Sequence, residues 1–205
     1  MPPITKKRLF GIDRSGPPPA QTRSDQPLNP WTIPNAIGYI RLATIPAFLA
    51  VALSSRHGQD ALAVVMFGCI GWADYLDGFA ARLTGQYSRL GALLDPVVDR
   101  LLVISGMAVA WDFQLLPRWA IAVVIARELF MLVLSRYALS RGVEIKINWP
   151  GRLGVAPTMG APFFAMAGVH SLAVVLLYVG LALALLATVM YVRTGVIEIG
   201  RKVST

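Results

Sequence analysis

Residues 72–100 read WADYLDGFAARLTGQYSRLGALLDPVVDR and place four aspartates inside stretches that are otherwise apolar enough to cross a membrane. A charged side chain at the centre of a bilayer costs about 2.5–3.5 kcal/mol on insertion scales, so such residues usually serve a function. Asp74 and Asp77 lie three residues apart, and Asp95 and Asp99 lie four apart, which puts each pair on one face of a helix. Helices joined by a short turn pack antiparallel. We therefore expect the two acidic faces to oppose each other.

The residue types around these acids indicate which ion they would hold. Carboxylate oxygens suit Mg²⁺, Mn²⁺ or Ca²⁺ rather than zinc. The chain has one cysteine, Cys69, and two histidines, His57 and His170, so no Cys/His cluster competes for that role. The stretch therefore predicts a divalent metal that holds a pyrophosphate.

The same stretch resembles the signature of the CDP-alcohol phosphatidyltransferases. Asp-x-x-Asp-Gly-x-x-Ala-Arg occupies residues 74–82, and after eight residues Gly-x-x-x-Asp-x-x-x-Asp occupies 91–99, so every fixed position is filled. A pattern of this length is far more specific than a lone glycine motif. The resemblance implies a membrane enzyme that moves a phosphatidyl group from CDP-diacylglycerol to an acceptor hydroxyl and releases CMP. It also implies Mg²⁺ or Mn²⁺ as cofactor and a homodimer.

Roles for the four acids follow from this resemblance. It implies that Asp74, Asp77 and Asp95 bind metal, and that Asp99 both touches metal and acts as general base on the acceptor hydroxyl. The metal would neutralise charge on the pyrophosphate and position the lipid phosphorus for attack. Asp99 must then reach the attacking oxygen within hydrogen-bond distance.

Two further segments predict contacts with the CDP-lipid. Glycine at position 78 permits close backbone approach, and the arginine one turn later can pair with phosphate. Residues 34–41, PNAIGYIR, are similar to the family's Pro-Asn-x-x-Thr-x-x-Arg segment, with glycine where threonine is usual. A small hydroxyl residue before the second half of the signature matches a position near the CDP moiety in similar proteins. The residues predicted to bind the CDP-lipid are Asn35, Gly38, Gly78, Arg82 and Ser88.

The acceptor is indicated by two segments nearer the C-terminus. Arg127-Glu128 resembles the Arg-Glu pair of phosphatidylglycerophosphate synthases, where Arg127 would bind an acceptor phosphate, although a structural ion pair explains it equally well. Residues 151–155, GRLGV, keep Arg152 as one cation of the Gly-Lys-x-Lys-Thr stretch that those enzymes usually carry. The segment also resembles actinobacterial cardiolipin synthases, whose acceptor is phosphatidylglycerol. We rank glycerol 3-phosphate first, phosphatidylglycerol second and an inositol phosphate third.

Composition predicts the fold class. With 205 residues and 56% hydrophobic content, the chain is too apolar for an ordinary soluble domain. We expect an all-α integral membrane protein with a flexible basic tail over 1–30, a short interfacial segment leading into a membrane domain over 31–195, and a second tail over 196–205. Six transmembrane helices are expected, at 34–54, 61–82, 90–112, 117–140, 153–169 and 171–192.

Charge distribution predicts orientation. Lys and Arg gather in the N-terminal tail, at 82–89, at 136–152 and after residue 192, whereas the segments expected on the opposite side hold only Arg56 and Arg118. The positive-inside rule then places both termini and the acids on the cytoplasmic side, here of a bacterial plasma membrane. The basic residues form no helix face of the kind that binds nucleic acid, so membrane lipids are the expected partners.

A transporter is the alternative from a different functional class. Intramembrane acids also form proton or cation relays. A relay needs a path to both membrane faces, whereas these acids all lie toward one predicted side and are accompanied by Arg82 and Arg127, which suit phosphate. The transferase is therefore the preferred hypothesis.

Overall fold

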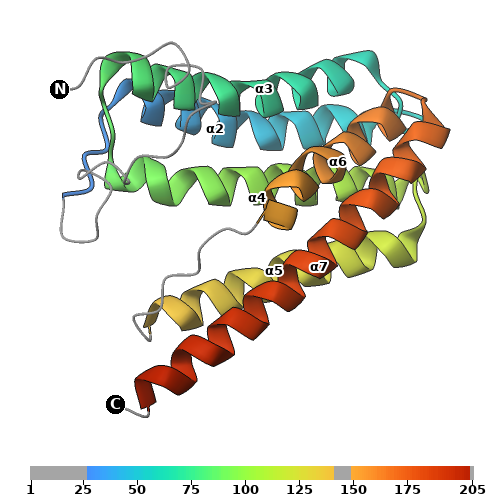
Figure 1. The fold of residues 1–205 in the computed structure, drawn as a ribbon. Coiled ribbons are helices and arrows are strands. Elements are labelled where there is room, and N and C mark those ends of the chain that lie inside the picture. The colour runs from blue at the N-terminus through green and yellow to red at the C-terminus, as the bar shows by residue number, and fades with distance from the viewer. Residues whose placement is uncertain (1–26, 141–148, 204–205) are drawn as a thin grey trace. The chain divides into compact units, whose positions relative to one another are not determined.

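The structure is a computed structural model that describes residues 27–140 and 149–203. Over these residues it contains helices and no strands, which confirms the predicted all-α class (Figure 1). The basic tail expected over 1–30 lies almost wholly outside the described residues. The helices, in chain order, are α2 (Ile33–Ser54), α3 (Ala61–Thr84), α4 (Arg89–Asp112), α5 (Arg118–Ser140), α6 (Trp149–Met166) and α7 (His170–Val203).

Among the described helices, three are long and apolar enough to cross a membrane: α2, α3 and residues 170–193 of α7. The other helices carry more charge or are shorter. For example, α4 contains Asp95, Asp99 and Arg100 in its interior, and α6 has 18 residues. The count of six spans therefore stays a prediction. Helix α7 also continues to Val203, past the end expected for the membrane domain.

The chain divides into two compact units. The first holds residues up to 54 together with 62–105, and the second holds residues 55–61 together with 106 onward. In the first unit, α2, α3 and the first part of α4 pack together, with the rings of Phe48 and Phe67 5.4 Å apart. In the second unit, α7 packs against α5 and α6.

Small residues allow α6 and α7 to approach closely within the second unit. A Cβ atom on Gly180 would lie only 2.7 Å from Oγ1 of Thr158 and 2.9 Å from its backbone nitrogen. Small residues at helix contacts are typical of membrane proteins, where packing rather than exclusion of water drives helix association. Pro157 and Pro162 lie inside α6 without ending it.

Side-chain caps satisfy backbone amides at the starts of α2 and α4. Oγ1 of Thr32 accepts a hydrogen bond from the backbone nitrogen of Asn35 at the start of α2 (3.3 Å), and Oγ of Ser88 accepts one from that of Gly91 at the start of α4 (2.9 Å). Oε1 of Gln86 also accepts a hydrogen bond from the backbone nitrogen of Ile33 (3.0 Å). Such caps satisfy amides that lack partners within the helix. The turn between α3 and α4 is thereby tied to the start of α2.

Candidate active site

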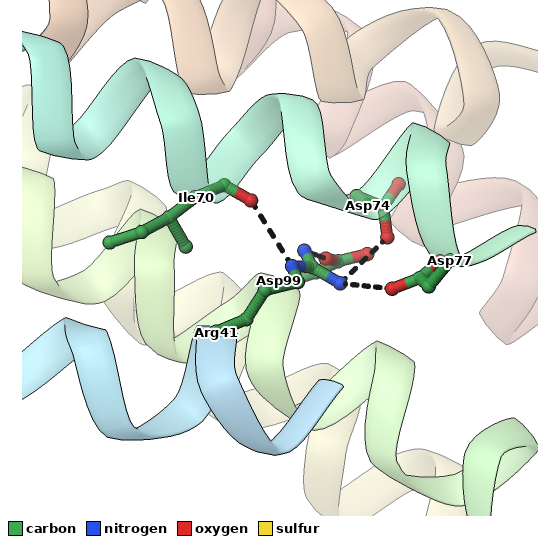
Figure 2. A network of polar contacts seen from close by, with 5 residues as sticks. All are labelled: Arg41, Ile70, Asp74, Asp77 and Asp99. Carbon is green, nitrogen blue, oxygen red and sulfur yellow. Dashed lines mark hydrogen bonds and ion pairs between the residues drawn. The ribbon is translucent and has the colours of Figure 1, made fainter. Parts of the chain in front are cut away.

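Arg41 of α2 lies at the centre of the acidic cluster (Figure 2). Its side chain is 1% exposed, and its Nε donates a hydrogen bond to the backbone oxygen of Ile70 (3.1 Å). One terminal nitrogen, NH1, lies 3.1 Å from Oδ1 of Asp74 and 3.0 Å from Oδ2 of Asp77, and the other, NH2, lies 2.7 Å from Oδ1 of Asp99. One guanidinium therefore joins three carboxylates and a backbone carbonyl.

These contacts bring the acidic faces of α3 and α4 together, as their spacing predicts. Asp74 and Asp77 lie on one face of α3, and Asp99 reaches the same guanidinium from α4. The side chain of Asp77 is buried, whereas those of Asp74 and Asp99 are 44% and 33% exposed. The sequence marked Arg41 as a cation inside an apolar stretch and as the last residue of the segment that resembles Pro-Asn-x-x-Thr-x-x-Arg, without a partner for it. The requirement that a buried cation be paired is the signal that points from it to the aspartates.

The fourth acid, Asp95, lines a cavity of about 180 Å³ that is partly open to the surroundings. This cavity belongs to the first unit, and Asp77 lines it as well. It also collects four of the five residues predicted to bind the CDP-lipid, which are Asn35, Gly78, Arg82 and Ser88. The exception is Gly38, which does not line it. The structure thus places two metal-ligand candidates and most nucleotide-binding candidates around one space.

Asn35 is held firmly in the wall of this cavity. Its Oδ1 accepts a hydrogen bond from Oγ of Ser88 (2.8 Å), and its Nδ2 donates to the backbone oxygens of Asn29 (3.0 Å) and Pro30 (3.1 Å). A Cβ atom on Gly91 would lie 2.7 Å from that Oδ1. The glycine at position 91 of the signature therefore leaves room for Asn35. The hydrogen bonds of Asn35 to other protein groups hold its side chain in the cavity wall.

The other two glycines have separate roles. A Cβ atom on Gly38 would lie 2.9 Å from Cδ2 of Leu94, so glycine at this position lets α2 and α4 pack closely where the family usually has threonine. A Cβ atom on Gly78 would lie 3.4 Å from NH1 of Arg82, which shows that the Arg82 guanidinium lies back over Gly78 at the cavity. Arg82 therefore lines the cavity, and its binding of a phosphate stays a prediction.

The residues predicted to bind the acceptor lie in the second unit. Nε of Arg127 donates a hydrogen bond to Oγ1 of Thr188 (3.0 Å), and its NH1 forms an ion pair with Glu128. Arg152, near the start of α6, is exposed. The structure therefore shows the Arg127-Glu128 ion pair, which was one of the two alternatives, and acceptor binding by Arg127 stays a prediction.

The donor set fits a divalent cation in chemical kind, because the four signature acids supply only oxygen. As the side chains stand, no group of three His, Cys, Asp or Glu residues in the described part of the chain is arranged to hold a metal ion. Arg41 binds one oxygen of each of Asp74, Asp77 and Asp99. Each of these carboxylates has a second oxygen that Arg41 does not bind.

The fold and the site define a helical membrane protein with an acidic cluster beside a cavity that Arg82 lines. The family model of the CDP-alcohol phosphatidyltransferases matches residues 31–192. The chain belongs to this family.

Relatives of this chain carry the names of two different enzymes, cardiolipin synthase and phosphatidylglycerophosphate synthase. A putative cardiolipin synthase of Mycobacterium tuberculosis is 37% identical over 122 residues, 59% of this chain and 57% of that protein. The cardiolipin synthase (CMP-forming) of Streptomyces coelicolor is 41% identical over 106 residues, 50% and 49% of the two chains. A probable phosphatidylglycerophosphate synthase of M. tuberculosis is 30% identical over 176 residues, 81% and 82%. The chain thus spans about half the length of the two cardiolipin synthase relatives.

Proposed function

We propose that this protein transfers a phosphatidyl group from CDP-diacylglycerol to an acceptor hydroxyl and releases CMP. The observation that carries the proposal is the meeting of the signature acids of α3 and α4 beside a cavity lined by Asn35, Gly78, Arg82 and Ser88. Membership of the family supports the same reaction.

The proposed mechanism assigns a task to each part of the site. A Mg²⁺ or Mn²⁺ ion held by Asp74, Asp77, Asp95 and Asp99 would neutralise charge on the pyrophosphate. Arg82 binds a phosphate of the CDP moiety as a fork-shaped donor. Asp99 accepts the proton of the acceptor hydroxyl, the acceptor oxygen bonds to the lipid phosphorus, and the bond from that phosphorus to the CMP oxygen breaks. The partial exposure of Asp99 supports this role, since an acceptor must reach it.

Glycerol 3-phosphate is the acceptor we propose, which would make the protein a phosphatidylglycerophosphate synthase. The M. tuberculosis relative with that name aligns over 81% of this chain, and Arg127 and Arg152 supply cations for an acceptor phosphate. Phosphatidylglycerol is the second candidate, because the relatives named cardiolipin synthase reach 37% and 41% identity over shorter alignments.

The test is phosphatidyl transfer by the purified full chain in detergent, with radiolabelled CDP-diacylglycerol and Mg²⁺. Glycerol 3-phosphate, phosphatidylglycerol and an inositol phosphate are offered in separate reactions. We expect labelled phosphatidylglycerophosphate and free CMP with the first acceptor, and neither after Mg²⁺ is removed with EDTA. Product only with phosphatidylglycerol would make cardiolipin synthesis the function. If no acceptor reacts and CDP-diacylglycerol does not bind, the transferase hypothesis is wrong, and ion flux in liposomes tests the transporter.

Placement in the cell is part of the same proposal. The apolar helices and the family support an integral membrane protein. We place it in a bacterial plasma membrane as a homodimer, with both termini and the acidic cluster on the cytoplasmic side. Labelling of single cysteines introduced before α2 and before α5, in a Cys69→Ser background, tests the orientation. Reaction of the first from inside and the second from outside is the expected result.

A further inference from the structure

Arg41 is surrounded by more negative charge than one guanidinium can neutralise. Its side chain is 1% exposed, and three carboxylates lie between 2.7 and 3.1 Å from its terminal nitrogens. Like charges this close repel one another, and partial burial strengthens the repulsion because water no longer screens it. Arg41 therefore supplies attraction that the acidic cluster needs while no divalent ion is bound.

We propose that Arg41 is the resident counter-cation of the acidic cluster. It holds Asp74, Asp77 and Asp99 together in the metal-free protein, and it sets how tightly the cluster binds a divalent ion. This inference rests on the divalent ion of the proposed function. It makes Arg41 a positioning residue, because the guanidinium acts through the three aspartates and needs no contact with substrate.

The geometry of Arg41 supports this role over that of a simple anchor for α2. Its Nε is occupied by the backbone oxygen of Ile70, which fixes the plane of the guanidinium against α3. The two terminal nitrogens then donate hydrogen bonds to Asp74, Asp77 and Asp99, which lie 33, 36 and 58 residues away in sequence. A planar fork of five donors can make these contacts at once, whereas an ammonium is a point charge with a different shape. An arginine that only anchored its helix would extend toward the lipid headgroups instead.

Charge balance gives the direction of the expected effects. Replacing Arg41 by a neutral side chain removes one positive charge and leaves the three carboxylates facing one another. The metal-free protein then loses stability, because the three carboxylates repel one another and the buried Asp77 loses its cation. Binding of a divalent ion restores that stability. The ion also binds more tightly, because a competing positive charge has gone. The substitution is therefore expected to lower the stability of the metal-free protein and to raise its affinity for the divalent ion. A general defect in folding would not raise that affinity.

The experiment compares the full-length wild type with Arg41→Gln and Arg41→Lys in detergent. Thermal unfolding is followed in EDTA and with excess Mg²⁺, and Mn²⁺ binding is measured by electron paramagnetic resonance. We expect Arg41→Gln to unfold about 5 °C or more below the wild type in EDTA. Mg²⁺ should restore most of that difference, and the variant should bind Mn²⁺ about threefold more tightly or better. Arg41→Lys keeps the charge and should bind Mn²⁺ as the wild type does.

Arg118→Gln is the matched control. Arg118 also donates its Nε to a backbone oxygen, that of Trp111 (3.2 Å), and lies over the ring of that residue, so its removal deletes an exposed cation outside the acidic cluster that has a similar backbone contact. Mg²⁺ should change the unfolding temperature of the Arg118→Gln variant by the same amount as that of the wild type. The inference is wrong if Arg41→Gln gains no more stability from Mg²⁺ than the wild type, or if it binds Mn²⁺ with equal or lower affinity.

A double variant tests the same role of Arg41 if Arg41→Gln cannot be purified. Arg41→Gln with Asp99→Asn removes one negative charge together with the cation, so it should purify and unfold in EDTA at a temperature nearer the wild type. Failure of this variant as well would show that Arg41 is needed for packing rather than for charge balance. None of these readouts involves phosphatidyl transfer. An inactive wild type with the expected Arg41→Gln response would therefore overturn the proposed function and leave this inference standing.

Discussion

A Cβ atom on Gly91 would lie 2.7 Å from Oδ1 of Asn35, the atom that accepts the hydrogen bond from Ser88. This relationship joins two sequence features that looked separate, a glycine of the acidic signature in α4 and an asparagine of the first turn of α2. The glycine is needed where the two helices meet, and the resulting contact forms part of the cavity wall.

Gly91→Ala should therefore destabilise the protein and weaken binding of CDP-diacylglycerol. The added methyl group must displace Asn35, and overpacking of this kind costs about 1–3 kcal/mol. Thermal unfolding in detergent and a binding titration with CDP-diacylglycerol measure the two effects. Gly71→Ala is the matched control, since a Cβ atom there meets only Cδ2 of Leu102 at 3.9 Å. Equal unfolding temperatures for the two variants would contradict the steric explanation.

Gly38→Thr should lower stability, although threonine is the usual residue of the family segment. Its Cβ would lie 2.9 Å from Cδ2 of Leu94, and we expect a loss of about 1 kcal/mol because the end of a leucine side chain can move. Leu94→Ala makes room for the threonine, so the double variant should lose less than the sum of the two single changes. Additive losses in thermal unfolding would show that the two positions are not coupled.

Asp99→Asn should abolish transfer while leaving CDP-diacylglycerol binding within about tenfold of the wild type. Loss of a general base lowers the rate by about 10²–10⁴-fold, and the amide cannot accept the hydroxyl proton. Rates and binding are measured on the same preparation, with Asp112→Asn at the end of α4 as the control. If Asp99→Asn transferred phosphatidyl groups at more than a tenth of the wild-type rate, the proposed general base would lie elsewhere.

Arg127→Lys distinguishes an acceptor site from a structural ion pair. If Arg127 binds the acceptor phosphate, loss of its two-pronged contact should raise KM for glycerol 3-phosphate about tenfold and leave KM for CDP-diacylglycerol unchanged. Steady-state kinetics with each substrate varied in turn provide the measurement, and Thr188→Val tests the hydrogen bond between Arg127 and α7. Unchanged KM values with a lower unfolding temperature would leave Arg127 as a structural partner of Glu128.

Prediction from sequence succeeded where the information is local. The apolar stretches predicted helices, and the three- and four-residue spacings placed each pair of acids on one face, because the helical period is the same in any context. The helix bounds differ from those expected mainly at the ends, as in α7, which runs on to Val203. Capping and packing decide such ends, and neither follows from apolar periodicity alone.

The amino-acid sequence by itself determined the family, the helical class and the four acids that carry the proposed chemistry. Only the tertiary structure decided that Arg41 would be their common partner, that Gly38 would pack against Leu94, and that Gly91 would make room for Asn35. Each of these contacts joins residues on different helices. Their distances depend on how closely whole helices approach one another, which is set by side-chain packing across the interface and not by the period of any single helix.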